Sequence, residues 1–279
     1  MFEILQKSLS TGVVTEGYPA APAEVSSRAR GRPEFDFANW KDARAAVAAC
    51  PTGALQSADN NGIRQVAFNL GKCTFCGLCA EADNAVRITH ACELAVTRKE
   101  DLTATAEYQI GSDGTHAKLI TSRTGSPSSQ SVADIGAELK KKISAVLGRS
   151  LHIREVDAGS CNGCEIEIVG LNSPVYDVER FGIHFVASPR HADMLLVTGP
   201  VSRNMELALR KTYEATPEPR LVVAVGACGC AGGIFGQNYA TVGGVDKVIP
   251  VDVYIPGCPP NPYALMNGIL LAIGKRTKS

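Results

Sequence analysis

The stretch LHIREVDAGSCNGCEIEIVG, residues 151–170, decides the fold expected for the second half of the chain. Its apolar beginning, Leu151–Val156, predicts a short β-strand, and the residues from Cys164 to Leu171 predict a helix. The loop between them carries Cys161 and leads into Cys164. A strand, a cysteine-bearing loop and a helix therefore follow one another directly.

The same alternation of short strands and helices continues to the end of the chain. Further strands are predicted at Ile183–Ala187, Met194–Thr198, Leu221–Val225 and Val251–Ile255, and further helices at Ser202–Ala215 and Pro262–Ile273. Such alternation favours an α/β fold with a mostly parallel sheet covered by helices on both faces. Ligands on these sheets bind beyond the carboxyl ends of the strands.

Each cysteine-bearing loop of this half follows the carboxyl end of a predicted strand. The cysteines are Cys161 and Cys164, then Cys228 and Cys230, then Cys258. If the strands are neighbours in one sheet, these loops converge at one edge, and four thiolates can surround one metal centre. Glycines accompany every loop, and they let backbone N–H groups approach inorganic sulfide and stabilise its negative charge.

Structural zinc is the alternative for such cysteines, because Cys-x-x-Cys with a later Cys-x-Cys can form a tetrahedral site. Zinc ribbons are local, whereas the cysteines here are spread from Cys161 to Cys258. The Cys258-Pro259 pair is an ending common in iron–sulfur ligation. The spacing therefore favours an iron–sulfur centre.

A second cysteine group lies in the first half of the chain. Cys73, Cys76 and Cys79 have the spacing of a tight loop that presents three thiolates, and Cys50-Pro51 stands upstream. In two-cluster ferredoxins the run is C-x2-C-x2-C-x3-C-P, and its fourth cysteine binds the other cluster. Cys50 is therefore expected to be the fourth ligand of this group.

The same repeat places the ligands of a second cluster at positions that hold no cysteine. These positions are Trp40, Ala43, Ala46 and Asp83. One cluster of an ancestral pair has therefore been lost completely and its neighbour kept. Asp83 is interpreted as an ordinary surface carboxylate.

Composition excludes several classes of protein. The chain has 279 residues, which suggests about two domains, each able to bury its own core. Lys and Arg number 28 and Asp and Glu number 28, so no net charge attracts nucleic acid or anionic lipid. The ten cysteines follow no secretory signal, so a reducing cytosolic location without disulfides is expected.

The segments outside the cysteine groups have their own expected roles. Met1–Gly12 predicts an amphipathic helix, within an extended arm over residues 1–34. The polar stretch Gly111–Ser131 predicts a linker, and Ala137–Leu147 a helix, within a connecting segment over residues 101–150. The longest apolar stretch, Tyr263–Gly274, is too short to cross a bilayer. Membrane association would therefore be peripheral or through a partner.

Four side chains outside the predicted ligand sets could also have a functional or a structural role. Glu165 and Glu167 follow Cys164, and each is either a proton carrier raised in pKa by burial or a helix N-terminal acid favoured by the dipole. His191 either contacts a large subunit or is a structural histidine, and the structural interpretation is favoured. Cys92 matches no ligand position and is interpreted as a small buried residue.

The motifs of the second half resemble a known family. CNGCEIEI from Cys161, SPRHADMLLVTGP from Ser188, GACGCAGGIF from Gly226 and VDVYIPGCPPNP from Val251 resemble the small subunit of energy-converting (group 4, formate hydrogenlyase type) NiFe hydrogenases, itself homologous to the complex I subunit that holds the terminal cluster. The resemblance implies a flavodoxin-like domain over residues 151–279. It implies a 4Fe-4S cluster on Cys161, Cys164, Cys228 and Cys258, with Cys230 as an extra thiol.

The first half resembles the ferredoxin-like subunit of the same complexes. The matching motifs are GYPAAP from Gly17, RGRPEF from Arg30 and FNLGKCTFCGLC from Phe68. The resemblance implies a small α+β ferredoxin-like domain over residues 35–100, preceding the flavodoxin-like one. It implies a second 4Fe-4S cluster on Cys50, Cys73, Cys76 and Cys79.

Together the two resemblances imply an electron-transfer subunit with two 4Fe-4S clusters and no catalytic residue of its own. The implied partners are a NiFe hydrogenase large subunit, integral membrane subunits and a ferredoxin-like or other electron-donor subunit, at the cytoplasmic face of the inner membrane. A quinone oxidoreductase of the complex I type is the alternative, but Asn162 and Gly163 separate two cysteines that are adjacent there. A zinc-binding scaffold whose cysteines are relics is a third hypothesis.

Overall fold

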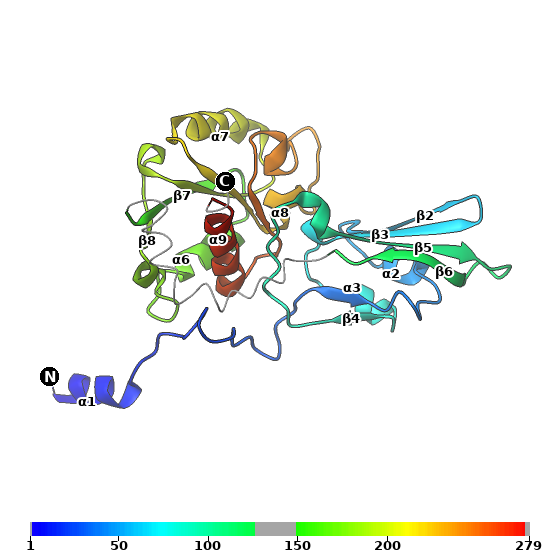
Figure 1. Ribbon diagram of the computed structural model, residues 1–279, viewed down its shortest axis with the longest axis horizontal. Helices are drawn as coiled ribbons and strands as arrows, with labels where there is room; N and C mark the ends of the chain where they lie inside the picture. Colours follow the sequence, from blue (N-terminus) through cyan, green and yellow to red (C-terminus); the bar gives the residue numbers. More distant parts are fainter. Residues whose placement is uncertain (1, 126–148, 277–279) are drawn as a thin grey trace.

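The second half of the protein is built on a five-stranded parallel sheet in the computed structural model, which describes residues 2–125 and 149–276 (Figure 1). The strands are β7 (Leu151–Asp157), β8 (Ile183–Phe185), β9 (Met194–Thr198), β10 (Leu221–Val225) and β11 (Val253–Ile255). They lie in the order β11-β10-β9-β7-β8, and each neighbouring pair is parallel. This is the flavodoxin-like order, so the predicted α/β fold is confirmed.

Helices cover both faces of this sheet because its central strands are apolar on both sides. All five residues of β9 and of β10 are buried, as expected for a parallel strand between two helical layers. The longer helices are α6 (Gly163–Gly170), α7 (Arg203–Ala215) and α9 (Pro262–Arg276), and the short ones are α8 (Gly226–Ala231), η3 (Val178–Phe181), η4 (Pro189–His191) and η5 (Val245–Lys247). Leu196 of β9 packs in one core with α6 and α9, whereas Leu195 packs in another with α7.

The first half is a small α+β unit with antiparallel strands. Four strands, β2 (Leu55–Asn60), β3 (Ile63–Asn69), β5 (Thr103–Ile110) and β6 (His116–Arg123), form a sheet in the order β2-β3-β5-β6. The remaining pair, β1 (Pro33–Phe35) and β4 (Val86–Ile88), is also antiparallel. The helices are α2 (Arg44–Ala48), α3 (Leu78–Ala82), η1 (Leu70–Lys72) and η2 (Lys99–Leu102).

The prediction of a linker from Gly111 is wrong over its first part. His116–Arg123 forms β6, the outer strand of the four-stranded sheet, paired along β5. Most of its side chains are exposed, so the strand keeps a polar sequence that resembles a linker. The rest of the predicted linker beyond Gly125, and the predicted helix Ala137–Leu147, lie outside the described residues.

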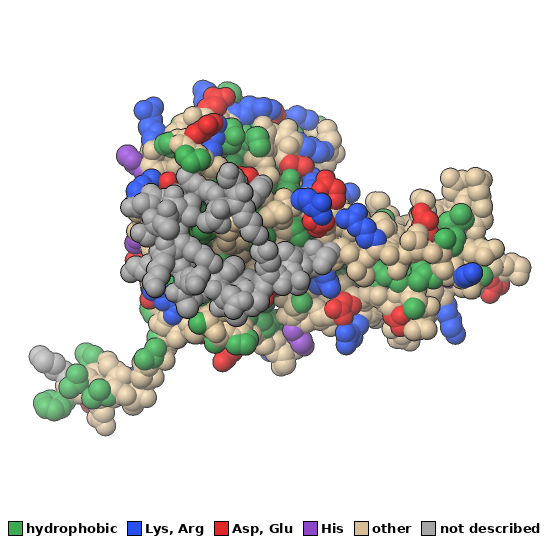
Figure 2. Space-filling model, viewed as in Figure 1, with side chains coloured by type: hydrophobic (Ala, Val, Ile, Leu, Met, Phe, Trp, Pro, Cys, Tyr) green, Lys and Arg blue, Asp and Glu red, His purple; other side chains and the backbone are tan. Residues whose placement is uncertain are grey.

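The N-terminal arm is confirmed to begin with a helix, α1 (Phe2–Thr11), that projects from the body (Figures 1 and 2). None of its residues is buried, and its apolar side chains Phe2, Ile4, Leu5 and Leu9 are exposed. The arm then lies on the second half, where Arg180 donates hydrogen bonds to the carbonyl oxygens of Glu16 (2.7 Å) and Tyr18 (2.8 Å). Within the described ranges, no helix is long and apolar enough to cross a membrane.

The two halves share a hydrophobic core. Leu70 and Leu102 of the first half pack with Val197 and Ala224 of the parallel sheet in one cluster of buried side chains. An antiparallel bridge also joins Val96 to the edge strand β11 at Tyr254, through backbone hydrogen bonds of 3.0 and 2.8 Å. The first-half unit therefore covers part of the sheet face that α7 leaves open.

Candidate metal centres

Four cysteines of the second half gather beyond the carboxyl ends of three parallel strands. Cys161 follows β7, Cys164 lies in the first turn of α6, Cys228 lies in α8 directly after β10, and Cys258 follows β11. Burial raises the pKa of the Cys164 thiol, and negative charge on Glu165 and the other three thiols raises it further. The predicted convergence of these loops is therefore present in the structure.

Two glycines keep space open around the sulfur atoms of this group. A Cβ on Gly226 would lie 2.7 Å from Cys164 Sγ, and a Cβ on Gly233 would lie 2.7 Å from Cys228 Sγ. Both glycines have positive φ angles, +78° and +56°, that other residues rarely adopt. The backbone thus forms a cradle around the thiols that any side chain would fill.

This group lies at the protein surface. Cys161 and Cys258 are exposed, whereas Cys164 and Cys228 are partly buried. Burial raises the pKa of Cys228 to about 11, and the neighbouring Cys258 and Cys161 thiols add to the effect. Thiols that repel one another as anions become stable thiolates when a cationic metal centre binds them.

Apolar side chains are exposed on the same elements that carry the thiols. They are Ile166 and Val169 on the outer side of α6, and Ile234 and Phe235 in the loop after α8. Each exposes more than half of its surface, with fractions of 69%, 69%, 60% and 56% respectively. Exposed apolar groups gathered on neighbouring elements are typical of a protein interface.

The cysteines of the first half form a second group. Cys50 follows α2, Cys73 ends η1, Cys76 lies in the next loop and Cys79 lies in α3. Burial raises the pKa of Cys73 to about 12, with smaller contributions from Cys79, Cys50 and Cys76. The upstream Cys50 therefore lies near Cys73, and its role as the fourth ligand stays a prediction.

Backbone N–H groups already point at the sulfur atoms of this group. The N–H of Leu55 donates to Cys50 Sγ, and the N–H of Phe75 donates to Cys73 Sγ, each at 3.4 Å. Phe75 has a φ of +57°, and Gly77, with a φ of +86°, precedes α3. Such N–H···S contacts favour thiolates, and they are among the means by which proteins tune iron–sulfur centres.

Three of the four positions that lack cysteine form part of the core beside this group, and the fourth, Asp83, is partly buried. Trp40, Ala43 and Ala46 are buried, and the Trp40 indole N–H donates to Asp83 Oδ2 at 2.7 Å. Asp83 Oδ1 also accepts from the backbone N–H of Ala85. The interpretation of Asp83 as an ordinary surface carboxylate is therefore wrong, because the side chain holds a buried indole in place. Sequence spacing could not reveal this pairing.

The two remaining cysteines lie outside both groups. Cys230 is fully buried, and its thiol donates to the carbonyl oxygen of Ala224 at 3.7 Å. Cys92 is partly rather than fully buried, and it lines a cavity of about 230 Å³ together with Cys258 and Phe75.

Within residues 2–125 and 149–276, no group of three or more His, Cys, Asp or Glu side chains is arranged to hold a metal ion directly.

The carboxylate next to Cys164 is held by the end of β9. Thr198 donates a hydrogen bond to Glu165 Oε1, while Glu165 Oε2 and Glu155 Oε1 have no hydrogen-bond partner among the described residues. Burial raises the pKa of Glu167 and of Glu155. Glu165 lies in the first turn of α6, where the helix dipole favours an acid. Its two interpretations, a proton carrier and a helix N-terminal acid, both stay predictions. The side chain of His191 is exposed, so nothing in the structure supports a structural role for it.

Comparison with known proteins relates the second half to a family of redox subunits. Residues 161–272 match the family described as NADH ubiquinone oxidoreductase, 20 Kd subunit. The chain is 50% identical over 145 residues to "Formate hydrogenlyase subunit 7" of Escherichia coli strain K12, covering 52% of this chain and 55% of that protein. It is 48% identical over 143 residues to "Probable membrane-bound hydrogenase subunit mbhJ" of Pyrococcus furiosus, covering 50% and 86%.

Two solved structures are also similar. One is a chain of the membrane-bound sulfane sulfur reductase, an archaeal respiratory membrane complex, with 41% identity, a TM-score of 0.42, and coverage of 47% of this chain and 72% of that one. The other belongs to an NAD+-reducing NiFe-hydrogenase, with 20% identity, a TM-score of 0.36, and coverage of 44% and 92%. The chain spans about half the length of formate hydrogenlyase subunit 7.

Proposed function

We propose that this chain, which belongs to the family of the NADH ubiquinone oxidoreductase 20 kDa subunit, is the electron-transfer small subunit of a membrane-associated NiFe hydrogenase complex. The observation that carries the proposal is the convergence of Cys161, Cys164, Cys228 and Cys258 around a glycine cradle. Thiolates in such a cradle suit a 4Fe-4S cluster, which supplies one-electron chemistry when bound.

The residues of this site would each have a distinct task in holding that cluster. The four thiolates would anchor it, from the segments that follow β7, β10 and β11. Gly226 and Gly233 leave the space that its sulfides need, because a Cβ at either position would lie 2.7 Å from a ligand sulfur. The buried ends of β10 and β11, Val225 and Ile255, fix the loops that follow them, so the thiols would keep their positions during electron transfer.

A second cluster on Cys50, Cys73, Cys76 and Cys79 completes the proposed electron carrier. Support comes from the clustering of these thiols and from the N–H groups of Leu55 and Phe75 that face two of them. The two clusters would pass single electrons between a redox partner and the nickel–iron site of a separate large subunit. The whole complex, and not this chain alone, would oxidise or evolve hydrogen.

The exposed surfaces suit the proposed partners. The exposed apolar side chains Ile166, Val169, Ile234 and Phe235 lie on the elements that carry Cys164 and Cys228, and a large subunit docked there would exclude water and oxygen from the thiols. The projecting α1 would contact integral membrane subunits, placing the chain on the cytoplasmic face of the inner membrane. A ferredoxin-like or other electron donor would approach the first half.

A quinone oxidoreductase of the complex I type is the second candidate, because the matching family is named for that enzyme. Hydrogen-dependent dye reduction by the purified complex separates the two candidates. We expect hydrogen to reduce the dye and nickel to be present, and Cys258→Ser to abolish the dye reduction. An intact complex that contains no nickel and reduces dye with NADH or quinol alone would contradict the hydrogenase proposal.

A further inference from the structure

One arginine of the N-terminal arm lies directly on the cysteine loop of the first half, residues 73–79. The Arg30 guanidinium donates a hydrogen bond to the backbone carbonyl oxygen of Cys76, with 2.6 Å between Nη1 and that oxygen. A Cβ on Gly77 would lie 3.7, 3.8 and 3.9 Å from Nε, Cζ and Cδ of Arg30. The Arg30 side chain therefore lies against the backbone of the cysteine loop, next to the proposed ligand Cys76.

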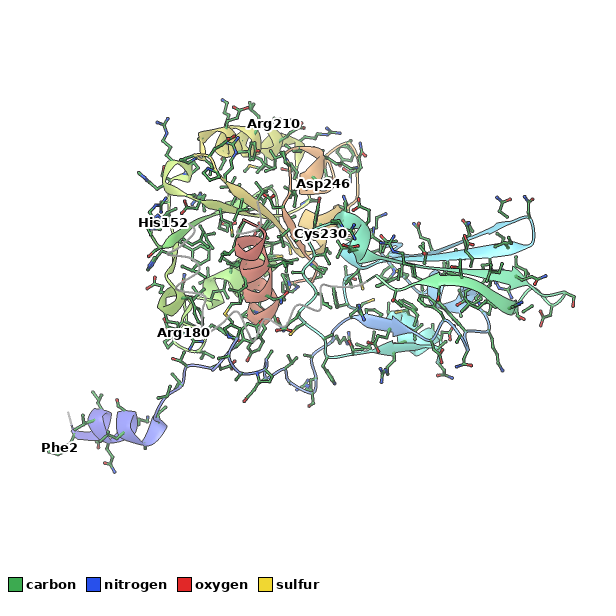
Figure 3. All side chains as sticks on the ribbon, in the orientation of Figure 1. Phe2, His152, Arg180, Arg210, Cys230 and Asp246 are labelled. Carbon is green, nitrogen blue, oxygen red and sulfur yellow. The ribbon has the colours of Figure 1, made fainter. Side chains whose placement is uncertain are left out.

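The backbone on either side of Arg30 is held in place. The N–H of Gly31 donates to the carbonyl oxygen of Thr89, just after β4, at 2.7 Å. A Cβ on Gly31 would lie 2.4 Å from the carbonyl oxygen of Ala91, so any other residue here would force the two segments apart. Further upstream, the arm is bound to the second half by Arg180, which is labelled in Figure 3. The position of Arg30 over the loop is therefore fixed by the path of the arm.

The positive charge of Arg30 is not paired with a carboxylate in the described parts of the chain. By contrast, Arg32 lies 3.6 Å from Glu34 and Arg87 lies 2.6 Å from the same carboxylate, so both share its negative charge. A guanidinium stays protonated at every physiological pH. Arg30 therefore brings a positive charge to the cysteine loop, and solvent screens that charge only in part although the side chain is exposed.

A positive charge beside an iron–sulfur centre changes how readily the centre accepts an electron. Reduction adds one negative charge to the centre, and a nearby cation stabilises that charge. The reduction potential of such clusters is set by net charge, hydrogen bonds to the sulfurs and exposure to solvent. The N–H groups of Leu55 and Phe75 supply hydrogen bonds to two sulfurs of this group, and Arg30 supplies charge to the same loop.

We propose that Arg30 raises the reduction potential of the cluster proposed for the first half. The inference rests on the proposed function and adds the residue that makes electron entry at this cluster more favourable. The step moves one electron and no proton: a one-electron donor is oxidised, the cluster is reduced, and the guanidinium stabilises the negative charge gained. Arg30 is a positioning residue, because it contacts the backbone of Cys76 and binds neither iron nor sulfur.

The test is Arg30→Gln in the complex purified anaerobically with its partner subunits. Glutamine removes the charge and keeps an N–H donor. We expect full iron content and a lower midpoint potential of the first-half cluster in a redox titration followed by EPR. The ratio of reduced to oxidised cluster at a given potential should fall about two- to fivefold, a shift of about 20–40 mV for one electron. The EPR signal that disappears in Cys50→Ser identifies the first-half cluster.

Two further variants separate charge from loop structure. Arg28→Gln is the matched control, because Arg28 is exposed on the same segment and its side chain forms no hydrogen bond or ion pair within the described ranges. Its midpoint potential should equal that of the wild type. Arg30→Lys keeps the charge and should keep most of the potential, which a purely structural role of the guanidinium fork would not allow.

The outcomes distinguish this inference from the function on which it rests. An unchanged potential in Arg30→Gln, or loss of iron in that variant, would overturn the proposal. An equal fall in Arg28→Gln or in Arg30→Lys would also overturn it, because the effect would then be neither specific to Arg30 nor due to its charge. A wild-type complex with no EPR signal that depends on Cys50 would instead refute the first-half cluster and with it the proposed function.

Discussion

The first-half unit contains two sets of four positions that match the ligand spacing of the ferredoxin repeat, one with four cysteines and one with none. Cys50, Cys73, Cys76 and Cys79 are four neighbouring thiols, with backbone N–H groups directed at two of them. The other set, Trp40, Ala43, Ala46 and Asp83, fills its space with a buried indole, two methyl groups and a carboxylate that accepts the indole N–H at 2.7 Å. The second set is thus packed with side chains, and its buried indole donor has a hydrogen-bond partner.

The comparison shows what a cluster site requires and what replaces it. A cube of four irons holds its surroundings together through four thiolates, and without it the same space must be filled by side chains. Trp40 packs within a cluster of aromatic rings, with its ring centre 5.4 Å from that of Phe35. Asp83 prevents the indole N–H from being buried without a partner.

The largest effect should come from the thiol that lies furthest from its partners in sequence. Cys50→Ser should remove about four irons and one EPR signal, because each iron of the cube needs an anchor. Cys92→Ser is the matched control and should keep the full iron content, since Cys92 lies outside both groups. Unchanged iron in the first variant, or a loss of about four irons in the second, would show that the fourth ligand is assigned wrongly.

Substitution of Trp40, in the set without cysteines, should lower the stability of the protein rather than its metal content. Trp40→Ala should lower the free energy of unfolding by about 3–5 kcal/mol, the usual cost of deleting a buried aromatic side chain. Anaerobic urea titration followed by circular dichroism measures it, with iron content determined in parallel before unfolding. If the variant is folded but has lost iron, Trp40 contributes directly to the neighbouring cluster site.

A smaller effect should follow from removing the partner of the indole. Asp83→Ala leaves the Trp40 N–H without its acceptor and should cost about 1–3 kcal/mol of stability. Asp83→Asn keeps a carbonyl oxygen that can accept the same hydrogen bond, so it should recover most of the loss. Equal stability of the two variants in the urea titration would show that the hydrogen bond does not matter.

The smallest effect is expected for the extra thiol between the halves. Cys230→Ser should leave the iron content unchanged, because Cys230 belongs to neither ligand group and its thiol faces the carbonyl oxygen of Ala224. The buried hydroxyl can donate to the same oxygen, which limits the loss of stability. Loss of about four irons in colorimetric iron determination would place Cys230 among the ligands.

The parallel sheet could be predicted because its signals are local. Leu221–Val225 is an unbroken apolar run, Met194–Thr198 is apolar up to its final threonine, and the structure gives both ranges the same bounds as β10 and β9. The convergence of Cys161, Cys228 and Cys258 followed from strand polarity, since parallel strands end at one edge. These inferences needed only the order of elements along the chain.

The features that the sequence did not reveal depend on contacts between distant segments. β6 was missed because an outer strand with exposed side chains keeps a polar composition, which in His116–Arg123 resembles a linker. The Trp40–Asp83 hydrogen bond joins residues from two separate loops, and neither has a local signature. The packing of η1 against α8 likewise requires knowing how the two halves meet.

The iron content of the complex tests the central claim most directly. With one kept cluster in the first half and one in the second, this chain should bind about eight irons, against about twelve if the filled set also held a cluster. Anaerobic iron determination, corrected for the separately measured content of the partner subunits, gives the number. About eight irons, with two EPR signals on reduction, is the predicted result. A colourless chain that contains zinc, or one with about four or about twelve irons, would contradict the account.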